Sequence, residues 1–415
     1  MSIPRFRSFL CGWLVLDVFI GPASPLLSLQ LSVWVVLGLS FVYVKRLFSF
    51  IDIATAAFLG CLLTIIAASA INLCFGDSEL VTLGDVALDV NTQNIKWSVH
   101  LAIACIMYGV FKSLLFLKTT KIHLNFVSVV LVACGLYVAL AIVFALNVEI
   151  FWIIKNWFFR VDIGMSSNEE LARAGYLSRY PFIFLDPNNS AYFVLMLSIF
   201  VIEDPWSPSW ARKTAWLTAL ASPILSASSG GLLALWVYMG VKVTVLAWDV
   251  LVCRRESWMP KLSHLLYVVF GAALAAVAWL RIEDIEQLGV VSRLLLKADS
   301  PDPRAEKYFY LLSAGWPPIL GRGHTMVVDG EWFKPHSDHL RLLYGYGVIV
   351  YLSAGIVLCK HFKLSKSSYF IIPVVVASAL NSVIDEPRFL FSFIVLLAVT
   401  NTRPISVSPR ASDLS

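Results

Sequence analysis

Long apolar runs, separated by short polar turns, follow one another along most of the chain. An α-helix needs about 20 apolar residues to cross a bilayer. About twelve runs approach or exceed this length, so the pattern predicts an all-α, polytopic membrane protein. The predicted spans cover approximately residues 9–20, 26–44, 51–75, 95–117, 124–147, 190–202, 214–225, 232–252, 262–280, 340–358, 369–384 and 389–400.

Positively charged residues mark the same side of the membrane at every second turn. Lys45-Arg46, Arg254-Arg255 and Lys360 each follow the end of a predicted span. Such residues stay on the cytoplasmic side, so we expect both termini to be cytoplasmic. Alternation then places the remaining connections outside: residues 21–25, 76–94, 148–189, 226–231, 281–339 and 385–388.

The polar segment 281–339 is the longest outer loop and divides the chain. Residues 1–280 contain the first nine predicted spans and the outer loop 148–189. Residues 340–403 contain the last three spans, and residues 404–415 form a short cytoplasmic tail. The pattern therefore predicts a membrane scaffold that holds one long loop between its ninth and tenth spans.

Composition agrees with this interpretation. Hydrophobic residues make up 59% of the chain and charged residues 14%, whereas a soluble domain carries about 25% charged residues. The net charge of +5 is small, and without a dense basic run it does not indicate nucleic-acid binding. The seven cysteines lie mostly in apolar runs without a CxxC pair, so we expect neither disulfides nor cysteine-bound metal.

Arginines gather in the predicted outer segments, where lysine is sparse. Arginine binds phosphate through a planar fork of donors and is always charged. A group of such residues outside a bilayer suits the pyrophosphate of a lipid-linked substrate. The alternative is that each arginine pairs with an acidic residue or a lipid headgroup. The candidate pyrophosphate ligands are Arg173, Arg179, Arg304, Arg322 and Arg388.

His336 is the candidate general base, because a histidine can take a proton from a sugar hydroxyl at neutral pH. The alternative is an interfacial histidine that hydrogen-bonds the loop. His339 shares a helical face with His336, and Asp338 lies between them, so a metal site is conceivable; no further ligands complete it. We expect Asp338 to orient an imidazole or to bind a sugar hydroxyl.

The order of these motifs resembles the O-antigen polymerase and O-antigen ligase superfamily. That family's pattern has an arginine, a GxG, a histidine at the start of a span and a small-residue turn within the span. Asp186-Pro187-Asn188 resembles its Pro-Asn element, whereas Ser229 stands where the family usually has an arginine. Arg173 or Arg179 can substitute for it. The matching order in this chain is Arg304, Trp316-Pro317, Gly321-Arg322-Gly323, His336-Ser337-Asp338 and Gly345-Tyr346-Gly347.

The resemblance implies a GT-C-like, metal-independent glycosyltransferase without a cofactor in the bacterial inner membrane, with its active site facing the periplasm. The donor is a glycan on undecaprenyl pyrophosphate, and the partners include a chain-length regulator. His336 and Arg304 are the implied catalytic residues, and Asn188, Asp338 and His339 join the arginines in substrate binding.

Two enzyme functions follow from the resemblance, and a third function belongs to another class. A polymerase uses a second lipid-linked glycan as acceptor, whereas a ligase uses lipid A-core. The stretch His336 to Tyr344 is more similar to the polymerases. A flippase for the same lipids would need ionisable groups near mid-membrane, and Asp17 is the one good candidate.

The predicted topology can be checked with phosphatase fusions. Alkaline phosphatase fused after Trp316 is expected to be active, because residues 281–339 are predicted to be periplasmic. A fusion after Arg255 is expected to be inactive. An inactive fusion at Trp316 would place the candidate site in the wrong compartment.

Overall fold

Three apolar runs form helices that are long and apolar enough to cross a membrane within the described part of the chain. In the computed structural model they are α4 (Ile53–Phe75), most of α5 (Val90–Leu115) and most of α6 (Thr120–Leu146). The structure describes residues 3–23, 29–48, 51–76, 80–83, 86–115, 120–159, 179–184, 186–251, 310–311, 313, 315–328, 331–333, 337–362 and 366–400.

Most other described helices also coincide with predicted apolar runs, but their apolar stretches are shorter. The ninth predicted span, residues 262–280, lies outside the described residues. The other described α-helices are α1 (Ile3–Ile20), α2 (Leu31–Val42), α3 (Val44–Phe48), α7 (Val148–Phe159), α9 (Pro187–Glu203), α10 (Ser209–Leu225), α11 (Ser229–Leu251), α16 (Asp338–Leu340), α17 (Val348–Phe362), α18 (Ile371–Leu380) and α19 (Pro387–Thr400).

Helix α9 occupies the centre of the core. Every residue from Asn189 to Val201 is buried, as expected for a helix that is apolar on all sides. The Phe193 ring contacts Phe19 and Phe389 with ring centroids 6.4 and 6.1 Å apart, which joins α9 to α1 and α19. The sixth predicted span is therefore a buried helix that other helices surround.

A small sheet crosses one end of the helix bundle, which the all-α prediction missed. Its strands are β1 (Leu80–Leu83), β2 (Val86–Asp89), β3 (Met326–Val328) and β4 (Glu331–Phe333), in the order β2-β1-β4-β3. Two antiparallel hairpins meet where Thr82 pairs with Glu331 in parallel. The sheet therefore joins two loops that are more than two hundred residues apart and were both predicted to lie outside.

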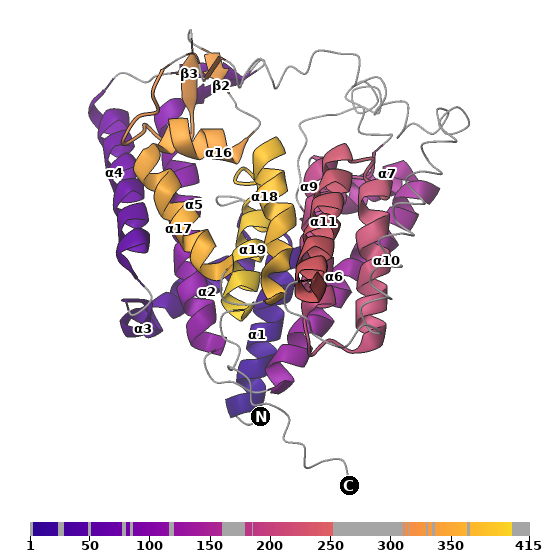
Figure 1. Cartoon of the computed structure of the whole chain (residues 1–415). Coiled ribbons are helices and arrows are strands. Elements are labelled where there is room, and N and C mark those ends of the chain that lie inside the picture. The colour runs from indigo at the N-terminus through magenta and orange to yellow at the C-terminus, as the bar shows by residue number, and fades with distance from the viewer. Residues whose placement is uncertain are drawn as a thin grey trace.

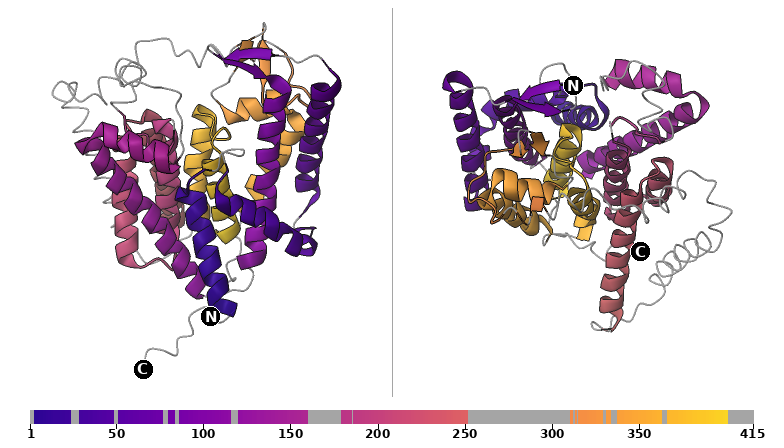
Figure 2. Two further views of the ribbon diagram at one scale, coloured as in Figure 1. Left: turned by 180° about the vertical axis from the view of Figure 1, so that it is seen from behind. Right: turned by 90° about the horizontal axis from the view of Figure 1, so that it is seen from above.

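We call this end of the bundle the sheet end. Helix α16 and the start of α9 lie at the sheet end, and α1 begins at the opposite end (Figure 1). Helices α4, α5 and α17 form one half of the bundle, and α6, α7, α10 and α11 form the other. Helices α18 and α19 lie between the halves (Figures 1 and 2).

The helix that follows the long polar loop is interrupted at Gly345 and Gly347. A π-helical turn, Arg341–Tyr346, separates α16 from α17, and Gly347 has a φ of 97°. The backbone of Gly321-Arg322-Gly323 fills the interruption: Gly321 N donates to Tyr346 O (3.0 Å), and Gly323 N donates to Gly345 O (2.9 Å). Such π-helical turns occur often at functional sites.

The close approach of these two backbones explains the glycines. A Cβ on Gly321 would stand 1.9 Å from Gly345 O, and a Cβ on Gly345 would stand 2.6 Å from Gly323 O. Gly323 has a φ of 123°, which disfavours other residues. The two GxG motifs therefore form one docking contact, although more than twenty residues separate them.

The docking contact predicts a large effect of adding one methyl group. Gly321→Ala and Gly345→Ala should each destabilise the protein by about 1–3 kcal/mol or more, because backbone atoms must move apart. Gly240→Ala on α11 is the control, since no heavy atom lies within 4 Å of its added Cβ. Thermal unfolding of the purified protein in detergent measures the difference; an unchanged Tm for Gly321→Ala would contradict the contact.

Candidate functional site

The turn between α18 and α19, residues 381–386, connects two groups of polar side chains at the sheet end. We call it the α18–α19 turn. One group surrounds Arg179 at the start of α9, and the other surrounds Asp385 below α16. Each group combines residues from predicted outer segments, and the second group also includes Arg341 from the predicted tenth span.

Arg179 is half-buried and contacts both the end of its own predicted outer segment and the outer segment 226–231. Its Nη2 donates to Asn188 Oδ1 (2.9 Å), and its Nε donates to the Ser226 carbonyl (3.3 Å). Ser228 Oγ donates to the same Asn188 oxygen (2.8 Å). Arg179, the Asp186-Pro187-Asn188 turn and the serine-rich turn 226–231 therefore form one site, which we call the Arg179 site.

Local sequence explains why Asn188 and Ser228 are available there. Asp186 caps α9 by accepting from Asn188 N (2.8 Å), and Pro187 occupies the first helical position, where its missing N–H is not needed. Ser228 Oγ accepts from Gly231 N (3.0 Å) in the first turn of α11. Two helix N-termini, with their partial positive charge, therefore begin beside the Arg179 guanidinium, an arrangement that favours an anion.

A buried lysine holds the segment that carries Arg179. Lys155 of α7 is 1% exposed and donates from Nζ to the Phe184 carbonyl. Its Nζ also lies 4.4 Å from the centre of the Trp152 ring, a cation–π contact. Lys155 of the aromatic helix α7 therefore anchors residues 179–184 and has a structural role.

Asn381 connects the Arg179 site to the α18–α19 turn. Its Nδ2 donates to Asp186 Oδ2 (3.3 Å) and to Asn189 Oδ1 (3.4 Å). Both acceptors lie at the start of α9, so the turn and α9 are held together by side-chain amide contacts.

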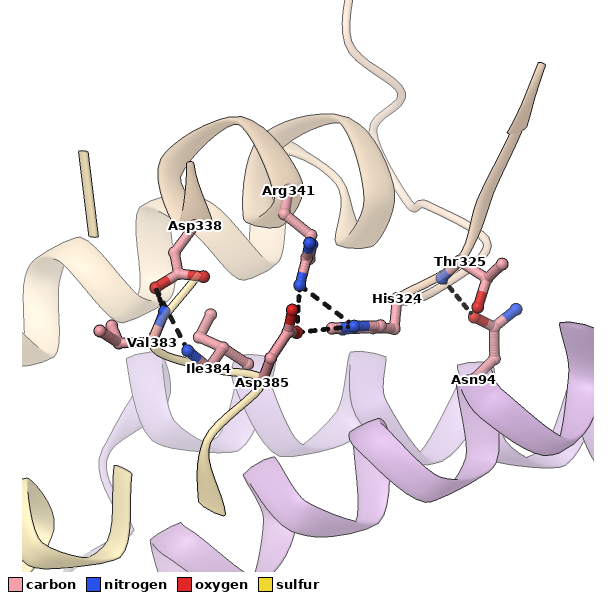
Figure 3. A network of polar contacts seen from close by, with 8 residues as sticks. All are labelled: Asn94, His324, Thr325, Asp338, Arg341, Val383, Ile384 and Asp385. Atoms are coloured by element: carbon pink, nitrogen blue, oxygen red, sulfur yellow. Dashed lines mark hydrogen bonds and ion pairs between the residues drawn. The ribbon is translucent and has the colours of Figure 1, made fainter. Parts of the chain in front are cut away.

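Asp385 is the centre of the second group. Its Oδ1 forms an ion pair with Arg341 Nη1 and lies 2.9 Å from His324 Nε2 (Figure 3). Arginine can only donate, so one carboxylate oxygen satisfies both neighbours when His324 also donates. We therefore assign the imidazole proton to Nε2; the 3.1 Å separation between Arg341 Nη1 and His324 Nε2 follows from their shared acceptor.

Helix α5 supports the His324 segment from the other side. The Trp97 ring stacks on the His324 ring, with centroids 4.8 Å apart and an interplanar angle of 24°. Asn94 Oδ1 accepts from Thr325 N (2.7 Å), as Figure 3 shows. Residues 323–325 are therefore fixed by α5 as well as by Asp385.

Asp338 fixes the backbone of the α18–α19 turn. Its Oδ2 accepts from Val383 N (2.8 Å) and Ile384 N (3.3 Å). Its Oδ1 is buried without a hydrogen-bond partner among the described residues. Burial, with Asp385 nearby, raises the pKa of Asp338 to about 8 although Arg341 opposes the shift. Asp338 therefore holds its proton to a higher pH than an ordinary carboxyl group does.

The predicted site residues fall into different environments. Arg179 and Asn188 come together, whereas Arg322 is exposed on the docked Gly321–Gly323 turn. His339 is half-buried, and its ring lies 6.1 Å from that of Tyr351; desolvation lowers the pKa of this imidazole. His336, Arg304 and Arg173 lie outside the described residues.

Arg388 and Asp338 are more deeply buried than a ligand-binding role predicts. Arg388 is 6% exposed, and its Nη2 donates to the Gly21 carbonyl (2.8 Å), which ties α19 to the end of α1. Asp338 is 1% exposed and binds backbone amides. In this structure both side chains stabilise connections between elements.

His324, Arg341 and Asp385 have no role that the sequence pattern alone predicts. Arg341 lies inside the predicted tenth span, and a charged residue within an apolar run is a signal of a special role. His324 directly follows the GxG motif, but nothing local relates it to Asp385, sixty-one residues later. Only the docking of the two segments shows that these residues interact.

No protein-family model matches the chain, and no curated protein sequence matches it. The resemblance described above therefore remains a prediction from the motifs.

The proton on Asp338 predicts a pH-dependent effect of Asp338→Asn. The folded state binds this proton between the ordinary carboxyl pKa of 3.8 and about 8, so the Asp338 contribution to stability falls as pH rises through this window. An asparagine oxygen can still accept from the two amides but does not titrate. The Tm of the variant relative to the natural protein should therefore rise from pH 5 to pH 8 and level off above pH 8.

Thermal unfolding in detergent between pH 5 and 9 measures this difference. Parallel Tm profiles for the two proteins would show that Asp338 is ionised in the folded state.

Proposed function

We propose that the protein polymerises oligosaccharide repeat units carried on undecaprenyl pyrophosphate, at the periplasmic face of the bacterial inner membrane. The observation that carries the proposal is the Arg179 site. An arginine, an amide and two helix N-termini converge at one end of an apolar helical bundle, and such a combination suits a pyrophosphate group.

The proposed membrane arrangement has about twelve spans, cytoplasmic termini and the sheet end outside. Three long apolar helices support membrane association. The parallel contact between β1 and β4 supports a common side for residues 76–94 and 281–339, because it joins both loops. The Arg179 site and Arg322 lie on segments that share this side in the proposal.

The proposed reaction is a metal-independent glycosyl transfer. A hydroxyl of the acceptor sugar attacks the anomeric carbon of the donor, and the bond from this carbon to the pyrophosphate oxygen breaks. His336 takes the hydroxyl proton, and undecaprenyl pyrophosphate leaves with the bonding electrons. Arg179 and Arg304 stabilise the negative charge that develops on the leaving group, and Arg322 binds the pyrophosphate of the acceptor.

Two separate arginine positions favour a polymerase over a ligase. Arg179 contacts the start of α9, whereas Arg322 is exposed on the Gly321–Gly323 segment, which docks on the π-helical turn. A polymerase binds two substrates that carry the same pyrophosphate lipid, and a site for each would use one of these positions. A ligase binds one such lipid and takes lipid A-core as its acceptor.

A flippase is less well supported by the described residues. Asp17 was its best mid-membrane candidate, but Asp17 Oδ2 accepts from Ser32 N (2.7 Å) at the link between α1 and α2. This contact gives Asp17 a structural role at the end of a helix.

Deletion of the gene separates the polymerase from the ligase. Without a polymerase, surface lipopolysaccharide should carry a single repeat on lipid A-core, because attachment of the first repeat needs no polymerisation. Without a ligase, bare core should appear together with long polymer on the lipid carrier. Gel electrophoresis of lipopolysaccharide from the deletion strain distinguishes the two outcomes. Bare core with intact carrier-bound polymer would contradict the polymerase proposal.

Complementation of the deletion strain tests the residues. Arg179→Ala, Arg304→Ala and His336→Ala should reach normal membrane levels but fail to restore long chains, and Arg304→Lys should also be impaired because ammonium lacks the bidentate fork. Arg212→Ala is the matched control, since Arg212 donates to backbone carbonyls at the opposite end of α9. Full restoration by Arg179→Ala would remove the Arg179 site from the reaction.

A further inference from the structure

We propose that Asp385 is a positioning residue, which sets the place of Arg322 through His324 and Arg341. The kinetic part of this proposal rests on the proposed function. The structural part, a link between the α18–α19 turn and the docked Gly321–Gly323 segment, does not.

Asp385 joins the two partners of the backbone docking contact. His324 directly follows the segment Gly321–Gly323, and Arg341 begins the π-helical turn on which this segment docks. One Asp385 oxygen accepts from both side chains, as Figure 3 shows. The side-chain contacts of Asp385 therefore join the same two segments that the hydrogen bond from Gly323 N to Gly345 O joins.

Arg322 lies between the two docked glycines, and its side chain is exposed. Its neighbours on both sides are fixed, because Gly321 N and Gly323 N both donate to the interrupted helix. The Arg322 side chain is exposed, and no hydrogen bond or ion pair joins it to another described residue. Its backbone is thus held rigidly while its guanidinium is available to a ligand.

Burial of the supporting ion pair points to a role in geometry. Arg341 and His324 are 0% and 1% exposed, and a buried ion pair often stabilises a protein no more than apolar side chains of similar volume would. Such a pair does orient its side chains, because the guanidinium and imidazole donors must both point at one oxygen. The same turn contacts the Arg179 site through Asn381, so it sets two arginine positions relative to one another.

Hydrogen–deuterium exchange of the full-length protein in lipid nanodiscs tests the structural part. Asp385→Leu, which has no acceptor for Arg341 and His324, should expose the Gly321 and Gly323 amides, so that exchange of the peptide spanning residues 319–325 becomes about tenfold faster or more. Asp52→Leu is the control, because Asp52 forms an ion pair with Lys360 elsewhere in the protein. Unchanged exchange in Asp385→Leu would overturn the proposal.

A pair of His324 variants tests the same link without changing Asp385. A glutamine side-chain amide at this position can donate to Asp385 where the imidazole Nε2 did, whereas a leucine cannot. His324→Gln should therefore retain slow exchange in residues 319–325, and His324→Leu should lose it. Equal exchange rates in the two variants would show that the hydrogen bond does not position this segment.

A double-mutant cycle tests whether Asp385 acts through Arg322. With purified protein and a lipid-linked repeat unit, Arg322→Ala should raise KM about ten- to a hundredfold, the value of one charge-assisted contact. Asp385→Leu should also raise KM, and the double variant should be no worse than Arg322→Ala alone. Additive effects would overturn the positioning role. If the natural protein forms no polymer, the proposed function fails, while the exchange measurements still decide the structural link.

Discussion

The polar contacts of the α18–α19 turn determine how the two halves of the helical bundle meet. The turn contains backbone amides that are buried, and each must find an acceptor inside the protein. The Asp338 carboxyl group accepts hydrogen bonds from the amides of Val383 and Ile384. The Asp385 side chain of the same turn accepts from Arg341. Because these partners come from distant segments, satisfying the turn also assembles the sheet end.

Burial separates the arginines into two kinds. Arg341 and Arg388 are buried, and each is engaged by a carboxylate or a carbonyl that belongs to another element. Arg179 is half-buried and Arg322 is exposed, so these two remain accessible to a charged ligand. The arginines at the sheet end thus include both structural and ligand-binding candidates, and residue type alone does not tell them apart.

Much of the helical architecture could be predicted from local pattern. Helices α4, α5 and α6 follow from the lengths of their apolar runs, and α9 begins at the Asp-Pro-Asn sequence that caps it. The small sheet could not be predicted in this way. The single pairing of Thr82 with Glu331 depends on where the folded helices bring their loops, which is a non-local condition.

The sequence by itself determined which segments are apolar, which turns are polar, and which residue types could bind a pyrophosphate. These properties depend on local composition and on hydrophobic periodicity. Only the tertiary structure decided that Arg179 meets Ser226, that Asn188 meets Ser228, and that Asp385 meets His324 and Arg341. The physical reason is that a buried charge or amide must be satisfied by whichever partner packing brings within hydrogen-bond distance, and that partner lies far away in the chain.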